Sequence, residues 1–228
     1  MVTRRAGAWY ETPVQTAPTG SIVETEDDPT PIVLILAATL RRAEETPKLA
    51  AMMRNAKGNV ALRSTVDPQA ATIRFGDGRV CVVRGVAADT DVTISTDVNR
   101  MADENAPKPK VAGAATHARL ALTASKVLEP PTGPWRDEAR RFWARIEHHP
   151  RTPRGVHVVC TDERSQITLG TEPVEFEIHG TAHRLTALFT GGTVFGQEVL
   201  DGHLYAVGSL EHLAELTGRS IDVMTGRL

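Results

Sequence analysis

The sequence predicts an α+β fold made of two consecutive units, each a mostly antiparallel sheet with helices over one face. Hydrophobic residues recur with a helical period in some segments and with a period of two in others. The turn Gly76–Gly78 separates two segments of the second kind, as in a β-hairpin. A proline-rich segment, 129–134, divides the 228-residue chain, which is long enough for two small domains.

The N-terminal part of the chain is expected to form a flexible arm followed by two helices. Residues 1–31 carry four prolines and an acidic run without a sustained hydrophobic period, which is typical of an arm. Pro31 suits the first turn of a helix, so a helix is predicted over 32–45. A second helix is predicted over 48–57 and should end at Gly58.

Strands dominate the rest of the first unit. Alternating apolar residues predict four of them, at 59–63, 70–75, 79–84 and 91–95. Thr96 or Asp97 would then cap a short helix that carries Val98 and Met101. A strand and a helix complete the unit, at 108–112 and 114–128.

After the linker the order of elements starts again. An amphipathic helix is predicted over 135–149. Three strands are expected to follow, at 156–160, 165–169 and 174–179. The segment His179–His183 fits a hairpin, and 184–189 fits either a strand or a short helix.

The chain is predicted to end with one strand and one helix. The strand covers 203–207 and follows an Asp-Gly turn. The helix covers 209–216, with Ser209 as its N-cap and Gly218 as its stop.

The two halves also share a local pattern. Lys110–His117 matches Tyr205–His212, because each has a strand end, a glycine where the chain turns, and a histidine in the first turn of the next helix. We therefore predict two diverged copies of one unit, a tandem repeat that covers 32–130 and 135–228 and is joined by the linker 131–134.

Residues 48–130 resemble a sterol carrier protein-2 domain. The segment Asp91–Asp97 carries most of the resemblance, because it joins an Asp-x-Thr-Ile strand directly to an Asp-capped helix. The other matching segments are Gly58–Leu62, the hairpin Ala71–Val83, Lys108–Gly113 and the Ala- and Leu-rich closing helix. The second half matches less well, mainly in 185–192 and 201–208.

The resemblance implies a mixed sheet of about five strands in each unit, with an apolar tunnel between sheet and helices. It also implies a lipid-binding function, since members of the family bind fatty acyl chains, sterols or other lipids. Independently, helices rich in Ala and Leu can cover a sheet without filling every gap, and only 4% of the residues are aromatic.

Nine residues are candidates to line such a cavity, although ordinary core packing explains each of them as well. In the second half, three apolar residues would face two leucines of the last helix, with a histidine to orient a polar head group. The first half offers a corresponding, smaller set. The candidates are Phe189, Phe195, Leu204, Leu210, Leu213 and His212, and then Met101, His117 and Leu120.

The function favoured by the sequence is the binding, and the carriage or presentation, of a fatty acyl, sterol or polyketide-like lipid, without catalysis. An alternative is an enzyme of lipid or secondary metabolism that uses the cavity as a reaction chamber, with His212 or His117 as acid or base. A third interpretation is a structural or regulatory protein whose cavities are closed.

Composition argues against other classes of function. The 26 basic and 28 acidic residues give a net charge of −2, which removes electrostatic support for a nucleic-acid partner. The longest apolar run, 32–40, is too short for a membrane span, so we expect a cytoplasmic protein without integral membrane association. Zinc, phosphate-loop and nucleophile-elbow motifs are absent from the sequence, so no metal, cofactor or catalytic residue is expected.

Two further features have competing interpretations. The arginine-rich helix over 135–149 has acidic residues that balance its charge, which favours a solvated face over transient contact with an acidic membrane. Cys81 and Cys160 lie in apolar runs, which favours buried thiols, although their number also allows a disulfide.

Overall fold

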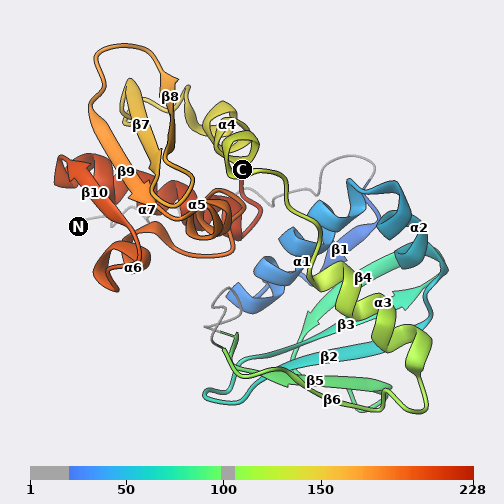
Figure 1. Ribbon diagram of the computed structural model, residues 1–228. Coiled ribbons are helices and arrows are strands. Elements are labelled where there is room, and N and C mark those ends of the chain that lie inside the picture. The colour runs from blue at the N-terminus through green and yellow to red at the C-terminus, as the bar shows by residue number, and fades with distance from the viewer. Residues whose placement is uncertain (1–20, 99–105) are drawn as a thin grey trace, which may run out of the picture.

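The computed structural model describes residues 21–98 and 106–228, and each half of the chain forms its own mixed sheet with helices packed on it (Figure 1). The fold is α+β, as the sequence predicts. The short helix expected around Met101 lies outside the described residues.

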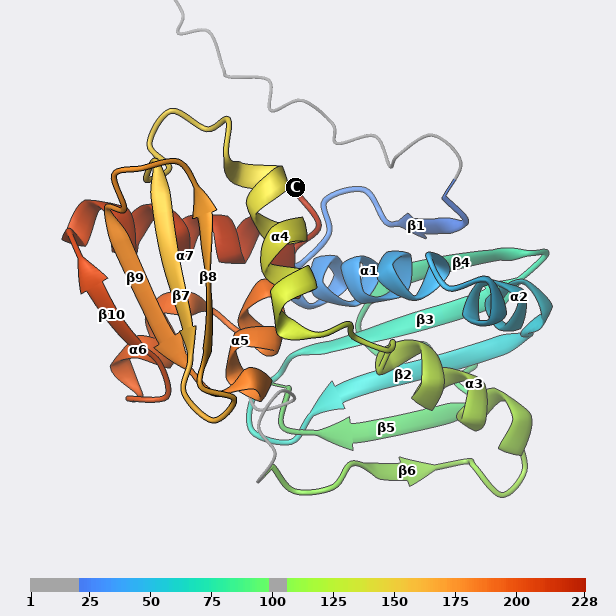
Figure 2. The same ribbon diagram turned by 45° about the horizontal axis from the view of Figure 1, so that its top comes forward.

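The first half forms a six-stranded sheet covered by three helices. Its strands are β1 (Val23–Thr25), β2 (Gly58–Ser64), β3 (Ala70–Gly76), β4 (Arg79–Arg84), β5 (Val92–Thr96) and β6 (Lys110–Ala112). Its helices are α1 (Pro31–Glu44), α2 (Pro47–Asn55) and α3 (Ala118–Leu128). The strand order is β1-β4-β3-β2-β5-β6, in which β2 pairs antiparallel with β3 and parallel with β5. Figure 2 shows the three helices on one face of this sheet.

Helix α1 buries a continuous apolar face. Val33, Leu36, Ala37 and Leu40 recur three and four residues apart and are at most 2% exposed. Together with residues of β2, β3 and β4 they form one hydrophobic core. Pro31 is the first residue of the helix, where its missing N–H costs no hydrogen bond.

The second half forms a four-stranded sheet with four helices. Its strands are β7 (Gly155–Cys160), β8 (Ser165–Gly170), β9 (Phe176–Gly180) and β10 (Tyr205–Gly208). Its helices are α4 (Trp135–Ile146), α5 (Ala182–Phe189), α6 (Phe195–Leu200) and α7 (Leu210–Met224). The strand order is β10-β9-β7-β8, in which β7 pairs antiparallel with β8 and parallel with β9. Alternate residues of β7 and β9 are buried, so one face of the sheet carries the core.

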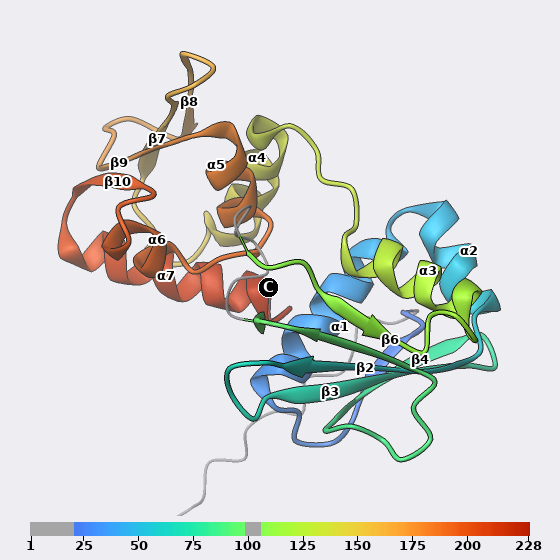
Figure 3. The same ribbon diagram turned by 60° about the horizontal axis from the view of Figure 1, so that its bottom comes forward.

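The two halves contact each other at α1 (Figure 3). The end of α7 reaches this helix, where Gly226 lies against Ala38. The guanidinium of Arg42 donates a hydrogen bond from Nη1 to the carbonyl oxygen of Thr190 at 2.6 Å. Thr190 is the C-cap of α5, and a cation at this end of a helix is favourable. Helix α1 therefore packs on its own sheet and also contacts the second half.

Part of the expected N-terminal arm belongs to the first sheet. Strand β1 pairs in parallel with β4, and Val23 is completely buried. Ion pairs add to this pairing, between Arg79 and Glu24 at 2.7 Å and between Arg84 and Glu26 at 3.0 Å. Residues 23–25 of the expected arm thus form a strand that the sequence did not predict, because a short strand that carries an acidic residue has too little hydrophobic pattern to be recognised. The sheets have six and four strands rather than about five each.

Two boundaries in the second half also differ from the prediction. The hairpin expected at His179–His183 is wrong, because Thr181 accepts a hydrogen bond from the Arg184 N–H and begins α5 there. The helix predicted to stop at Gly218 continues to Met224. Packing of Val223 in the core outweighs the cost of a glycine within the helix.

The glycine that follows β6, Gly113, has a positive φ and also lies close to the backbone of another segment, and substitution can test the two effects. Gly113 has a φ of +81°, and a Cβ atom there would lie 2.1 Å from the carbonyl oxygen of Asp91. Gly78 has a similar φ of +75° but open space around it. We expect Gly78→Ala to lower the free energy of unfolding by about 1–2 kcal/mol, the cost of the left-handed conformation alone. Gly113→Ala should lower it by roughly 3 kcal/mol or more, because the clash adds to that cost.

Urea unfolding followed by circular dichroism measures both variants. Equal losses for Gly78→Ala and Gly113→Ala would show that the close approach to Asp91 does not constrain this turn.

Candidate ligand-binding groove

A hollow in the protein surface lies between the start of α2 and the end of α3. It is open to solvent and has a volume of about 330 Å³. Its lining is formed by Thr46, Lys48, Leu49, Ser125, Lys126, Glu129 and Pro131. We call it the α2–α3 groove.

Helical spacing explains which side chains reach the groove. In α2, Leu49 is buried and supplies the apolar floor, while Lys48 before it is exposed. In α3, Ser125 and Lys126 lie on the exposed side, and Glu129, the C-cap of the helix, is exposed directly after it. Leu122, 55% exposed, lies three and four residues before Ser125 and Lys126, so it extends the same stripe with an apolar side chain.

The charge at the groove is mainly positive. Two of the five lysines of the chain, Lys48 and Lys126, line it, against one acidic residue, Glu129. The groove also receives the N-terminal end of α2, where the side chain of Thr46 makes no capping hydrogen bond. The partial positive charge of a helix N-terminus favours an anion. The arrangement therefore suits a molecule with an apolar body and an anionic end.

None of the eight candidate residues that the structure describes lines this groove. Phe189, Phe195 and Leu204 are at most 4% exposed in the core of the second half, and Leu213 packs against that core. Leu210 is 82% exposed, so its expected contact with these rings does not form. As the first residue of α7, it lies directly after the N-cap Ser209 and outside the helix face that packs on the sheet.

Aromatic rings fill the space over the second sheet. The ring centroids of Phe142 and Phe189 are 5.5 Å apart, and those of Phe176 and Phe195 are 6.1 Å apart. Both distances are typical of packed aromatic pairs. The residues expected to surround a ligand thus contact other side chains of the protein.

The remaining candidates are Leu120, Met101 and the two histidines. Leu120 is buried in the first core, and Met101 lies outside the described residues. His117 is 3.7 Å from the carboxylate of Asp91 through its Nε2 atom. His212 is 4.0 Å from the carboxylate of Glu175 through its Nε2 atom. The two histidines are in different halves, so they do not form one site.

The groove residues could not be predicted from the sequence, because the groove depends on how α2 and α3 pack against each other. The sequence holds one indication: on the predicted helix over 114–128, the face made of polar residues also carries an apolar residue, Leu122. This pattern identifies the exposed face of the helix, but it does not identify the element that packs beside that face.

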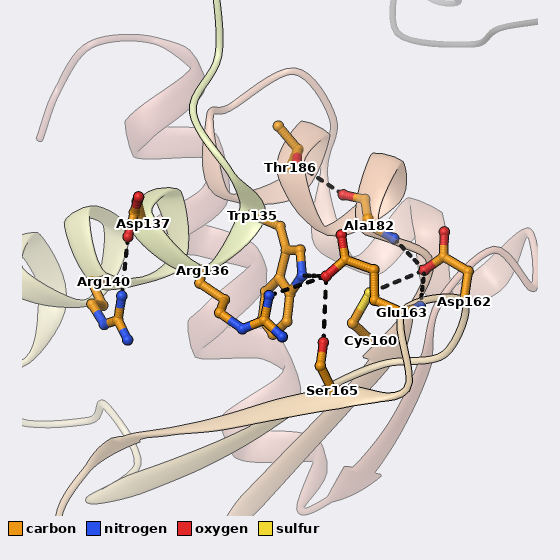
Figure 4. Close-up of polar contacts among 10 residues, drawn as sticks. All are labelled: Trp135, Arg136, Asp137, Arg140, Cys160, Asp162, Glu163, Ser165, Ala182 and Thr186. Atoms are coloured by element: carbon orange, nitrogen blue, oxygen red, sulfur yellow. Dashed lines mark hydrogen bonds and ion pairs between the residues drawn. The ribbon is translucent and has the colours of Figure 1, made fainter.

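A second cluster of polar side chains, at the turn between β7 and β8, forms a hydrogen-bond network (Figure 4). The thiol of Cys160 donates to Asp162 Oδ1 at 3.0 Å. Burial, and then this hydrogen bond, raise the pKa of Cys160. The raised pKa keeps the thiol protonated, which argues against a role as a nucleophile. Asp162 Oδ1 also accepts the N–H of Ala182, so the turn is tied to the start of α5.

Glu163 connects the same turn to α4. Its Oε2 atom accepts hydrogen bonds from Trp135 Nε1 at 2.9 Å and from Arg136 Nη1 at 3.0 Å (Figure 4). The hydrogen bond from Trp135, followed by the contact with Arg136, lowers the pKa of Glu163. These contacts position α4 and support a structural role for the network.

The described residues show neither a metal site nor a membrane span. No group of three or more His, Cys, Asp or Glu residues among them could hold a metal ion. Within the same ranges, every helix is too short or too polar to cross a membrane. Both cysteines are free, Cys81 in the first half and Cys160 in the second.

Comparison with known proteins gives weak structural similarities only. No protein-family model and no curated protein matches the chain. A crystal structure of sterol carrier protein 2 is similar over 42% of this chain and 91% of its own, at 19% identity and a TM-score of 0.30. A solution structure of a conserved hypothetical protein from Thermus thermophilus, with a suggested sterol carrier assignment, covers 84% of this chain and 85% of its own. Its identity is 10% and its TM-score 0.20. Similarities of this size carry no argument about function.

The contacts of Glu163 predict a pH dependence. Its folded pKa is below the unfolded value, so its stabilising contribution is complete at neutral pH and is lost as the pH falls. We expect the free energy of unfolding of the unmodified protein to fall more steeply between about pH 5 and pH 3 than that of Glu163→Gln. Urea unfolding at a series of pH values measures this difference.

Glu211→Gln, which changes an exposed carboxylate on α7, is the control and should retain the steep profile. Parallel profiles for Glu163→Gln and the unmodified protein would contradict the assignment.

Proposed function

We propose that this protein binds a hydrophobic small molecule with an anionic end, such as a fatty acid, in the α2–α3 groove, for carriage or presentation. The observation that carries the proposal is an open groove with Leu49 as its floor and with Lys48 and Lys126 in its lining. The apolar body would lie along Leu49 and Leu122. The head group would lie near the two lysines and the start of α2.

The dimensions suit a weak or moderate binding site. A volume of about 330 Å³ is at the lower end of the range for small-molecule sites. Each methylene removed from water contributes about 0.8 kcal/mol, so ten would contribute about 8 kcal/mol before the cost of immobilising the ligand. Because one side of the groove is open, we expect dissociation constants in the micromolar range or weaker.

We also propose that the two halves are copies of one unit, with 32–130 and 135–228 as the units, 131–134 as the linker and 1–31 preceding the first. The strand registers support this. In the parallel pair β2–β5, Val60 faces Val92. In the parallel pair β7–β9, Val156 faces Phe176. Each parallel pair has one antiparallel strand on either side, β3 and β6 in the first half and β8 and β10 in the second.

The same registers bring the end of β6 and the end of β10 into equivalent positions in the two halves. They place Gly113 opposite Val92 and Gly208 opposite Phe176, with a histidine four residues later in both halves. A Cβ atom on Gly113 or Gly208 would approach the carbonyl oxygen of Asp91 or Glu175, respectively. Those two acidic residues are the ones beside His117 and His212. Strand β4 has no described counterpart in the second half, which accounts for part of the weaker sequence match.

Binding of a fluorescent fatty acid tests the proposed function. Ser125→Trp should fill the groove, and Lys126→Glu should repel the anionic end. We expect each change to raise the dissociation constant by about tenfold or more, which is about 1.4 kcal/mol of binding free energy. Both residues are exposed, so neither change should disturb folding.

Matched changes at remote exposed positions are the controls. Leu200→Trp adds the same side chain on α6, and Lys110→Glu reverses the same charge on β6. Unchanged affinity in Ser125→Trp and Lys126→Glu, or equal losses in the controls, would overturn the groove as the binding site.

A further inference from the structure

A second, smaller pocket lies where the two halves meet. It has a volume of about 30 Å³, which is space for one or two water-sized groups. Helices α1 and α4 and the end of α5 line it, through Arg42, Glu45, Glu138, Arg141, Phe142, Arg145, Phe189 and Thr190. We call it the seam pocket.

Arg42 is the central cation of the seam pocket. Its Nη1 atom donates to the carbonyl of Thr190, but its Nε atom is buried without a hydrogen-bond partner among the described residues. A buried donor left without an acceptor costs about 1–3 kcal/mol. Burial also lowers the pKa of Arg42; the negative charges of Glu138 and Glu45 oppose this effect, and the positive charge of Arg145 adds to it. The two glutamates thus only partly offset the burial of the guanidinium, and its Nε–H still lacks an acceptor among the described residues.

The acidic residues of the pocket do not fully balance its cations. Three arginines and two glutamates line it, which leaves one positive charge. Glu138 is 6% exposed, and its Oε1 atom accepts hydrogen bonds from Gly133 N at 2.8 Å and from Arg141 Nη1 at 3.0 Å. Glu138 is thus engaged mainly with its own helix and with the linker. Arg145 is exposed at the pocket and adds to its excess positive charge.

We propose that the seam pocket binds one small inorganic anion of about the size of chloride, held between Arg42 and Arg145. The anion would accept a hydrogen bond from the buried Nε atom and neutralise the excess charge. The volume of the pocket excludes larger anions such as gluconate. Because Arg42 belongs to α1 and Arg145 to α4, the bound anion would stabilise the contact between the two halves. This proposal does not depend on the function of the α2–α3 groove.

Thermal unfolding in two salts tests the proposal. At equal ionic strength, sodium chloride and sodium gluconate screen exposed charges alike, so a difference between them reports specific binding. We expect the melting temperature to rise with chloride in a saturable way and to exceed that in gluconate. Arg145→Gln should lower the apparent chloride affinity at least tenfold.

Arg140→Gln is the matched control. Arg140 is on the same helix and forms an exposed ion pair with Asp137 at 3.0 Å, but it does not line the pocket. This variant should keep the full chloride response. An equal response in Arg145→Gln and the unmodified protein, or an equal loss in Arg140→Gln, would overturn the site.

Crystals grown with sodium bromide give a second readout that does not rely on stability. An anomalous bromide peak next to Arg42 Nε is the expected result. An ordered peak without anomalous signal at that position would show that water alone occupies the pocket, and the proposal would be wrong.

Discussion

The pairing of two parallel inner strands in each sheet, β2 with β5 and β7 with β9, is the constraint on which the rest of the fold depends. A parallel pair cannot be joined by a tight turn, so the chain must leave the first strand and return in the same direction. In the first half, Asp91 fixes the return: its N–H donates to the Asn59 carbonyl at 3.0 Å, and its carboxylate accepts the Asn59 N–H at 2.8 Å. Glu175 makes the corresponding backbone bond to Gly155 at 2.9 Å. With these strands fixed, one face of each sheet is apolar, and the helices must cover it.

Much of this fold was predictable because the hydrophobic periodicity, the turns and the helix caps depend on residues that are close together in the sequence. The alternating residues of β2 to β5, the Gly-Asp-Gly turn and the Ser209 cap each act over a few residues, so sequence alone identifies them. The failures involve partners distant in the chain. Strand β1 forms because it pairs with β4, about 55 residues later in the chain. Helix α7 continues past Gly218 because Val223 is buried in the core of the second half. Neither partner can be read from the local pattern.

The candidate site was less predictable than the fold, for a related reason. A groove is a property of two surfaces, and α2 and α3 are separated in sequence by most of the first sheet. The periodicity of α3 marks which residues are exposed, but the position of Lys48 opposite Lys126 depends on tertiary packing. The same holds for the seam pocket, where Arg42 and Arg145 are about 100 residues apart. Charge patterns within single helices therefore gave no indication of either site.

The aromatic residues of the two cores are concentrated in the second half, whereas the groove lies in the first half. Helices α1, α2 and α3 contain no aromatic residue, and Phe75 is the single ring among the described residues buried in their core. The core of the second half contains Trp135, Phe142, Trp143, Phe176, Phe189 and Phe195. Large rings contact many neighbours and leave little space between a sheet and its helices. The aromatic residues that the sequence suggested as ligand contacts are thus the ones that fill the interior of the second half, and the groove lies between two helices, α2 and α3, that carry no aromatic side chain.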